Sequence, residues 1–69
     1  MDANVLKRFV ADSRFCSSTE KCSVACATDD LSRAPWLDCL VDAWRCLDHG
    51  QKVAVNAFRT EAGKPAFND

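Results

Sequence analysis

The stretch C16-S-S-T-E-K-C-S-V-A-C26 holds three of the five cysteines of a 69-residue chain. Within it, Ser17 and Glu20 stand three residues apart, which is the spacing of a helix-starting capping box. In such a box each of the two side chains accepts a hydrogen bond from the backbone N–H of the other residue. The stretch therefore predicts a short helix from about Ser18 to Ala27. The clustered cysteines also suggest a metal site, a disulfide framework or a tightly packed core.

The residues before this stretch predict a further helical segment. Asp2 is a suitable N-cap, and Leu6, Phe9 and Val10 fall on one face at helical spacing. Residues that favour strands are sparse along the whole chain and do not alternate with polar ones. We therefore expect an all-α fold whose N-terminal helical arm, short or bent, covers residues 3–27.

The strongest periodic pattern lies downstream, where apolar residues repeat every seven positions. Residues 28–34 are expected to connect the arm to one helix over 35–62, with Ser32 able to cap it and Pro35 in its first turn. Because the register continues through Gly50, we favour one helix over two helices split at that glycine. Residues 63–69 are expected to form a tail. The residues predicted for the core or a dimer contact are Leu37, Leu40, Ala43, Leu47, Gly50, Ala54 and Ala57.

The apolar face of such a long helix is wider than the arm can cover. We therefore expect a single domain over residues 1–69, built as a helical hairpin with residues 3–27 antiparallel to residues 35–62. Two copies would then bury the remaining surface as a homodimer with four helices, the commonest symmetric solution.

Two disulfide bridges do not fit this hairpin. Cys22 and Cys26 are about 6 Å apart along a helix, whereas Cys39 and Cys46 are about 10.5 Å apart. A disulfide accepts Cα separations of only about 4.4–6.8 Å, so both rungs of a doubly bridged hairpin cannot close. The odd number of cysteines also disfavours a disulfide framework.

A zinc site is the second interpretation of the cysteines. Cys22, Cys26, Cys46 and His49 would supply three thiolates and one imidazole, a set that zinc accepts. The chain has one histidine, however, and the spacing of Cys22 and Cys26 lacks the turn residues of a zinc knuckle. We favour the third interpretation, in which the cysteines fill the core as small apolar residues, and we expect no cofactor.

The charge of the chain argues against several function classes. Nine basic and ten acidic residues are interspersed and give a net charge of −1, which is not typical of a nucleic-acid-binding protein. No stretch approaches the roughly 20 apolar residues of a membrane span, and no signal peptide pattern is present. We expect a cytoplasmic protein, and the alanine-rich composition without isoleucine or tyrosine suggests a GC-rich bacterial or phage genome. The short, amphipathic and aromatic-bearing helical chain suits an accessory protein of such a genome.

No constellation of catalytic side chains is apparent, so we expect no enzymatic activity. The chain is predicted to be a protein-binding module, an adaptor or inhibitor that regulates a larger cytoplasmic partner. Alternatives are a small DNA-binding regulator and a Cys/His zinc module. The aromatic and basic residues of the long helix are the predicted partner-binding set: Trp36, Trp44, Phe58, Arg45, Lys52 and Arg59.

Overall fold

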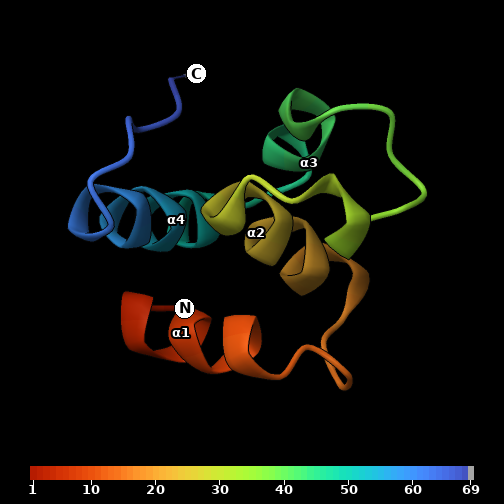
Figure 1. The fold of residues 1–69 in the computed structure, drawn as a ribbon, viewed down its shortest axis with the longest axis horizontal. Coiled ribbons are helices and arrows are strands. Elements are labelled where there is room, and N and C mark those ends of the chain that lie inside the picture. Colours follow the sequence, from red (N-terminus) through yellow and green to blue (C-terminus); the bar gives the residue numbers. More distant parts are fainter. Residues whose placement is uncertain (69) are drawn as a thin grey trace.

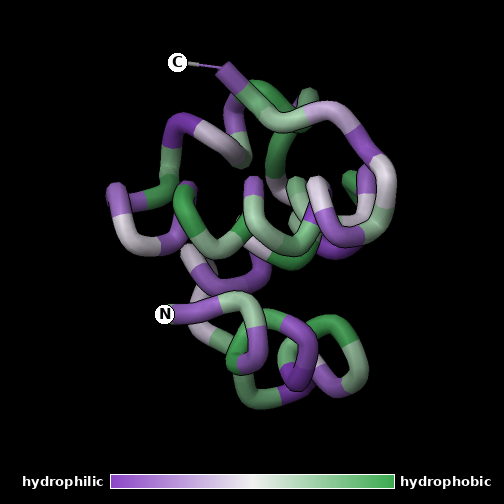
Figure 2. Tube along the Cα trace, turned by 90° about the vertical axis from the view of Figure 1, so that its left-hand side faces the viewer, coloured by the Kyte–Doolittle hydropathy of each residue, from purple (hydrophilic) through white to green (hydrophobic). Residues whose placement is uncertain are grey.

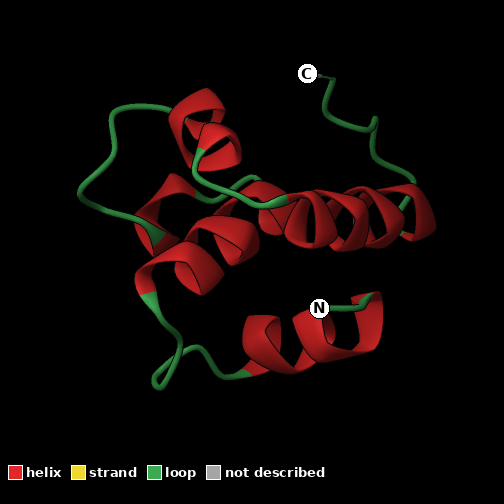
Figure 3. Cartoon of the chain, turned by 180° about the vertical axis from the view of Figure 1, so that it is seen from behind, coloured by secondary structure: helices red, strands yellow, loops and turns green. Residues whose placement is uncertain are grey.

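The computed structural model describes residues 1–68, and over this range it contains helices and no strand, which confirms the all-α prediction. Figure 1 and Figure 3 show the arrangement of the helices. The elements are α1 (Ala3–Ala11), α2 (Ser18–Thr28), the 3₁₀-helix η1 (Leu31–Arg33), α3 (Leu40–Arg45) and α4 (His49–Glu61). None of these helices in the described part is long and apolar enough to cross a membrane.

Both N-terminal helices begin where their capping residues predict. The Asp2 carboxylate accepts a hydrogen bond of 2.9 Å from the Val5 N–H at the start of α1. At the start of α2, the Glu20 N–H donates to Ser17 Oγ (3.2 Å), and the Ser17 N–H donates to Glu20 Oε1 (2.8 Å). The predicted capping box is therefore confirmed.

Helix α2 lies at the centre of the molecule (Figure 1) and contacts α1, η1, α3 and α4. Six consecutive residues, from Cys22 to Ala27, are buried, so α2 has no exposed face along this stretch. A helix that is buried all round is usually apolar all round. Here the buried residues are apolar except Ser23, and all of their side chains are small (Cys, Ser, Val, Ala), which lets neighbouring helices approach α2 from several directions.

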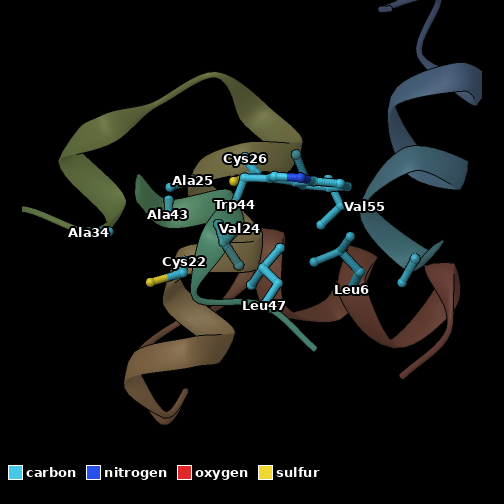
Figure 4. Close-up of a cluster of buried hydrophobic side chains, with 12 residues drawn as sticks. Leu6, Cys22, Val24, Ala25, Cys26, Ala34, Ala43, Trp44, Leu47 and Val55 are labelled. Carbon is cyan, nitrogen blue, oxygen red and sulfur yellow. The ribbon is translucent and has the colours of Figure 1, made fainter. Parts of the chain in front are cut away.

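The core forms around α2 from side chains of every α-helix. In Figure 4, Val24, Leu47 and Leu6 gather beside the indole of Trp44, and Val55 lies at its far end. Figure 2 shows α1 as a separate layer below the other helices, and its Leu6 is fully buried. The buried apolar residues are Leu6, Cys22, Val24, Ala25, Cys26, Ala27, Ala34, Ala43, Trp44, Leu47, Ala54 and Val55.

The prediction of one helix over residues 35–62 is wrong, because the chain leaves the helix between α3 and α4. Asp48 starts α4: its carboxylate accepts from the Gln51 N–H (2.7 Å), and Gln51 Oε1 accepts from the Asp48 N–H (3.0 Å). This second capping box offers the backbone a partner that competes with continued helix. Gly50 is the second residue of α4, so a split with Gly50 as the C-cap is wrong as well.

The predicted helix start at Pro35 is also wrong. Residues 34–37 form a β-turn in which the Leu37 N–H donates to the Ala34 carbonyl oxygen (3.1 Å). Proline favours the second position of such a turn because its ring fixes φ near the required value. Helix α3 consequently begins only at Leu40.

A single chain already buries several of the apolar side chains that the homodimer was expected to bury. The structure is a group of helices around α2 rather than a two-helix hairpin, and Trp44, Leu47 and Ala54 are already buried within it. The predicted tail, whose last residue Asp69 lies outside the described range, folds back on α4. Phe67 exchanges two hydrogen bonds with the Asn56 side chain, of 2.9 and 3.1 Å.

Candidate functional site

The β-turn at residues 34–37 presents an aromatic side chain to solvent. Trp36 occupies the third position of this turn and is 51% exposed, whereas Trp44 is only 5% exposed. In Figure 1 the segment between η1 and α3 swings out from the helices. Phe15 is more exposed (90%), but Trp36 is the largest apolar residue of the described chain that is at least half exposed.

Both end residues of this turn, Ala34 and Leu37, pack against the core. Ala34 is fully buried, and Leu37 packs against the core, so the apolar neighbours of Trp36 point inward while Trp36 points outward. Before the turn, the Arg33 guanidinium lies 3.5 Å from the Asp30 carboxylate and 3.4 Å from Ser13 Oγ. These contacts present Trp36 on a preorganised turn, which lowers the entropic cost of binding.

An exposed apolar side chain and two carboxylates follow Trp36 within six positions. Val41, in the first turn of α3, is 49% exposed, and Asp38 is exposed as well. Asp42, the residue directly after Val41 in α3, is half-buried. Exposed apolar residues therefore alternate with carboxylates along this stretch of the chain, a composition suited to a partner with an apolar pocket and a basic rim. We call Trp36, Asp38, Val41 and Asp42 the Trp36 surface.

The other predicted partner-binding residues do not share one face. Trp44 stacks on Phe67 with ring centroids 4.9 Å apart, and the Lys52 ammonium lies 5.3 Å from the Trp44 ring centroid. Arg45 is exposed, but the break after α3 separates it from Lys52 and Arg59, so these three basic residues do not lie along one helix. Of the predicted aromatic set, only Trp36 is largely exposed.

Arg59 has a structural role that the heptad pattern did not indicate. Its guanidinium donates to the Cys26 carbonyl oxygen (2.9 Å), to Asp29 (2.6 Å) and to the Pro65 carbonyl oxygen (2.7 Å). It also lies 4.6 Å from the Phe67 ring centroid. The hydrogen bond from Arg59 holds the pKa of Asp29 below its usual value. This arginine thus joins α2, α4 and the C-terminal segment.

The predicted core and dimer residues divide between interior and surface. Gly50 and Ala57 are exposed, so neither belongs to the core of the chain as predicted for this set. A Cβ built on Gly50 would meet only ordinary van der Waals neighbours, the nearest 3.5 Å away. Ala43, Leu47 and Ala54 are buried, while three apolar residues are partly buried against the core: Leu37, Leu40 and Phe58.

The residues of the weak zinc hypothesis differ in exposure. Cys22 and Cys26 are buried in α2, whereas Cys46 and His49 are exposed. Among residues 1–68, no group of three or more metal-binding side chains is placed to hold an ion. All five cysteines are free thiols. Burial raises the pKa of the Cys26 thiol to about 12 and raises that of Cys22, which disfavours the thiolate form that binds metals.

A small pocket opens between α1 and α4. It measures about 200 Å³, and an ion pair of 2.9 Å between Lys7 and Glu61 lies beside Phe58 and Ala62 in its wall. Sites for small organic ligands usually measure about 300–1,000 Å³. This pocket is therefore a poor candidate for a substrate site.

Comparisons of the chain with protein-family models, with curated proteins and with solved structures find no match. The Trp36 surface is the candidate functional site of the described residues. Sequence reasoning identified Trp36 but placed it on a helix, and it missed Asp38, Val41 and Asp42. The signal that was misread is Pro35 directly before Trp36, which marks a turn here and not the first turn of a helix.

Proposed function

We propose that the protein is a non-enzymatic binding module whose Trp36 surface docks into an apolar pocket on a larger cytoplasmic protein and regulates it. The observation that carries this proposal is the half-exposed Trp36 on a turn fixed at both ends. Tryptophan is enriched among residues that dominate protein–protein binding energies, and such anchors usually fill a pocket on the partner. Asp38 and Asp42 would face basic residues at the rim of that pocket.

The test compares two exposed apolar residues on different elements. Trp36→Ala removes the proposed anchor, while Val53→Ala shortens a side chain on α4 that is 56% exposed. We expect a stoichiometric partner captured from a lysate of the source cells to bind the wild-type and Val53→Ala proteins. Binding to Trp36→Ala should be at least tenfold weaker, since hot-spot truncations cost about 2 kcal/mol or more.

Circular dichroism should show that both variants keep wild-type helicity, because both side chains lie at the surface. A partner that binds Trp36→Ala as tightly as the wild-type protein would refute the proposed anchor. The predicted homodimer remains a separate prediction, which light scattering after gel filtration tests directly. A bacterial or phage origin is likewise part of the proposal, based on composition.

A further inference from the structure

The C-terminal segment, residues 63–68, packs on the ring of Trp44 without forming a helix or a strand. The Phe67 ring stacks on the Trp44 indole with ring centroids 4.9 Å apart and an angle of 18° between the planes. The Arg59 guanidinium lies 4.6 Å from the centroid of the same phenyl ring. Stacked rings and cations placed over rings attract each other beyond the area that they bury. The phenyl group is therefore the anchor of this segment.

Two side chains of α4 form hydrogen bonds with the main chain of the segment. Asn56 accepts from the Phe67 N–H (2.9 Å) and donates to the Phe67 carbonyl oxygen (3.1 Å). Arg59 Nε donates to the Pro65 carbonyl oxygen (2.7 Å). Proteins recognise extended peptides by such main-chain hydrogen bonds, combined with a site for one or more side chains. The residues that contact the segment, which we call the tail-binding surface, are Asp29, Trp44, Asn56 and Arg59.

The segment lies on the fold and is not part of its buried core. None of residues 63–68 is buried, although Phe67 is partly buried against the core. Gly63 adopts a φ of 77°, which glycine tolerates, where the chain turns after α4. The Lys64 ammonium lies 3.3 Å from the Asp29 carboxylate, and both side chains are partly exposed. The segment therefore occupies its surface as a bound peptide ligand would.

We propose that the tail-binding surface is a peptide-binding site, and that a second copy of this chain supplies the segment when the site's own segment is released. Exchange of an identical element between two copies is a low-cost route to a dimer, because the same contacts form in either arrangement. A short tether gives the chain's own segment an effective concentration in the millimolar range, so exchange increases with protein concentration. The proposal does not depend on the Trp36 surface.

Nuclear magnetic resonance on an isotope-labelled acceptor tests the site. The acceptor is the full chain with Phe67→Ala, which lacks the anchor and keeps the tail-binding surface. Its Trp44 indole N–H signal should differ from that of the wild-type protein, because the stacked ring is absent. A peptide of residues 63–68, added to about 5 mM, should return the signal toward its wild-type position. The matched peptide with Phe67→Ala should bind at least tenfold more weakly.

A second protein variant then replaces the peptide and tests the source of the segment. Unlabelled full-length Asn56→Leu carries an intact segment, and that segment has lost its main-chain partner on its own chain. It should move the Trp44 signal of the acceptor in the same direction as the peptide does. The control donor is the double variant Asn56→Leu/Phe67→Ala, which should leave the signal in place. A signal that moves with the peptide but not with the Asn56→Leu protein would overturn exchange between copies.

Other outcomes would overturn the binding site itself. These are equal effects of the two peptides, a shift of the Trp36 indole signal in place of the Trp44 signal, or a Trp44 signal that Phe67→Ala leaves unchanged. Circular dichroism checks that the acceptor keeps its helices. If Phe67→Ala does not fold, Phe67→Leu is the acceptor, since it keeps an apolar side chain and lacks the ring, and the same outcomes apply to it.

Discussion

Helices α2 and α4 start in the same way but differ in burial: the middle of α2 is surrounded by protein, whereas α4 has one face in solvent. Each begins with a capping box, Ser17 with Glu20 and Asp48 with Gln51. Helix α4 keeps an apolar face and a solvated face, as a surface helix does, whereas the middle of α2 is surrounded. A helix without a clear apolar stripe can therefore form the centre of a small fold when its side chains are small.

The largest expected effect comes from the side chain that joins the two helices. Arg59→Met should lower the free energy of unfolding by about 3 kcal/mol, because the Cys26 carbonyl oxygen loses a buried donor. The Pro65 carbonyl oxygen loses the same donor, and a hydrogen bond to a charged group contributes about 1.5–3 kcal/mol, whereas the ion pair with the exposed Asp29 adds little. Urea denaturation followed by circular dichroism measures the loss.

The matched control is Arg45→Met, the same substitution at an exposed position of α3. It should change the free energy of unfolding by no more than about 0.5 kcal/mol. Equal stability of the Arg59→Met and Arg45→Met variants would show that Arg59 does not join α4 to α2.

The second-largest effect is expected from a pair of substitutions that tests the difference in burial between α2 and α4. Ala25→Leu inserts a large side chain into a fully buried position of α2 and should destabilise the protein by about 2 kcal/mol. Ala57→Leu makes the same change at an exposed position of α4 and should have an effect within about 0.5 kcal/mol. Thermal unfolding of both variants makes the comparison, and a well-tolerated Ala25→Leu would contradict the surrounded state of α2.

The sequence predicted the helical class and the start of α2, because the Ser17–Glu20 box is a local pattern. The Asp48–Gln51 box is equally local, but the heptad register continues across it, since Trp44, Leu47 and Ala54 all reach the core. A register of apolar residues therefore does not prove that one helix carries it.

The partners of Arg59 were beyond prediction for a different reason. Cys26 and Asp29 are about thirty residues away in the chain, and only the packing of α4 on α2 brings them to the guanidinium. The exposure of Trp36 was similarly undetermined, because tryptophan serves equally well in a core or an interface. Residues that act through long-range packing leave no pattern in a single sequence.

Loss of the N-cap should destabilise the protein by the same smaller amount at α2 and at α4, because both helices begin with a capping box. Ser17→Ala and Asp48→Ala should each lower the free energy of unfolding by about 1 kcal/mol, the usual value of an N-cap. Asp38→Ala, an exposed aspartate outside any helix, is the control and should stay within about 0.5 kcal/mol. An Asp48→Ala variant as stable as the wild-type protein would show that the α3–α4 break does not depend on its capping box.

The smallest expected effect is a pH dependence at the contact between α2 and α4. The Arg59 hydrogen bond lowers the pKa of Asp29, so the stabilisation is present above the unfolded pKa of about 3.9 and is lost as the pH falls through the folded value. Because the Asp29 side chain is 44% exposed, solvent screening limits the contribution to a few tenths of a kcal/mol. Urea denaturation at pH 7 and pH 3 should show Asp29→Asn less stable than the wild-type protein at pH 7 and nearly equal at pH 3. In the Arg59→Met background that pH-dependent difference should shrink, because only the Lys64 ammonium, 3.3 Å from Asp29, then remains to lower the pKa of Asp29. An undiminished difference there would assign it to a group other than Arg59.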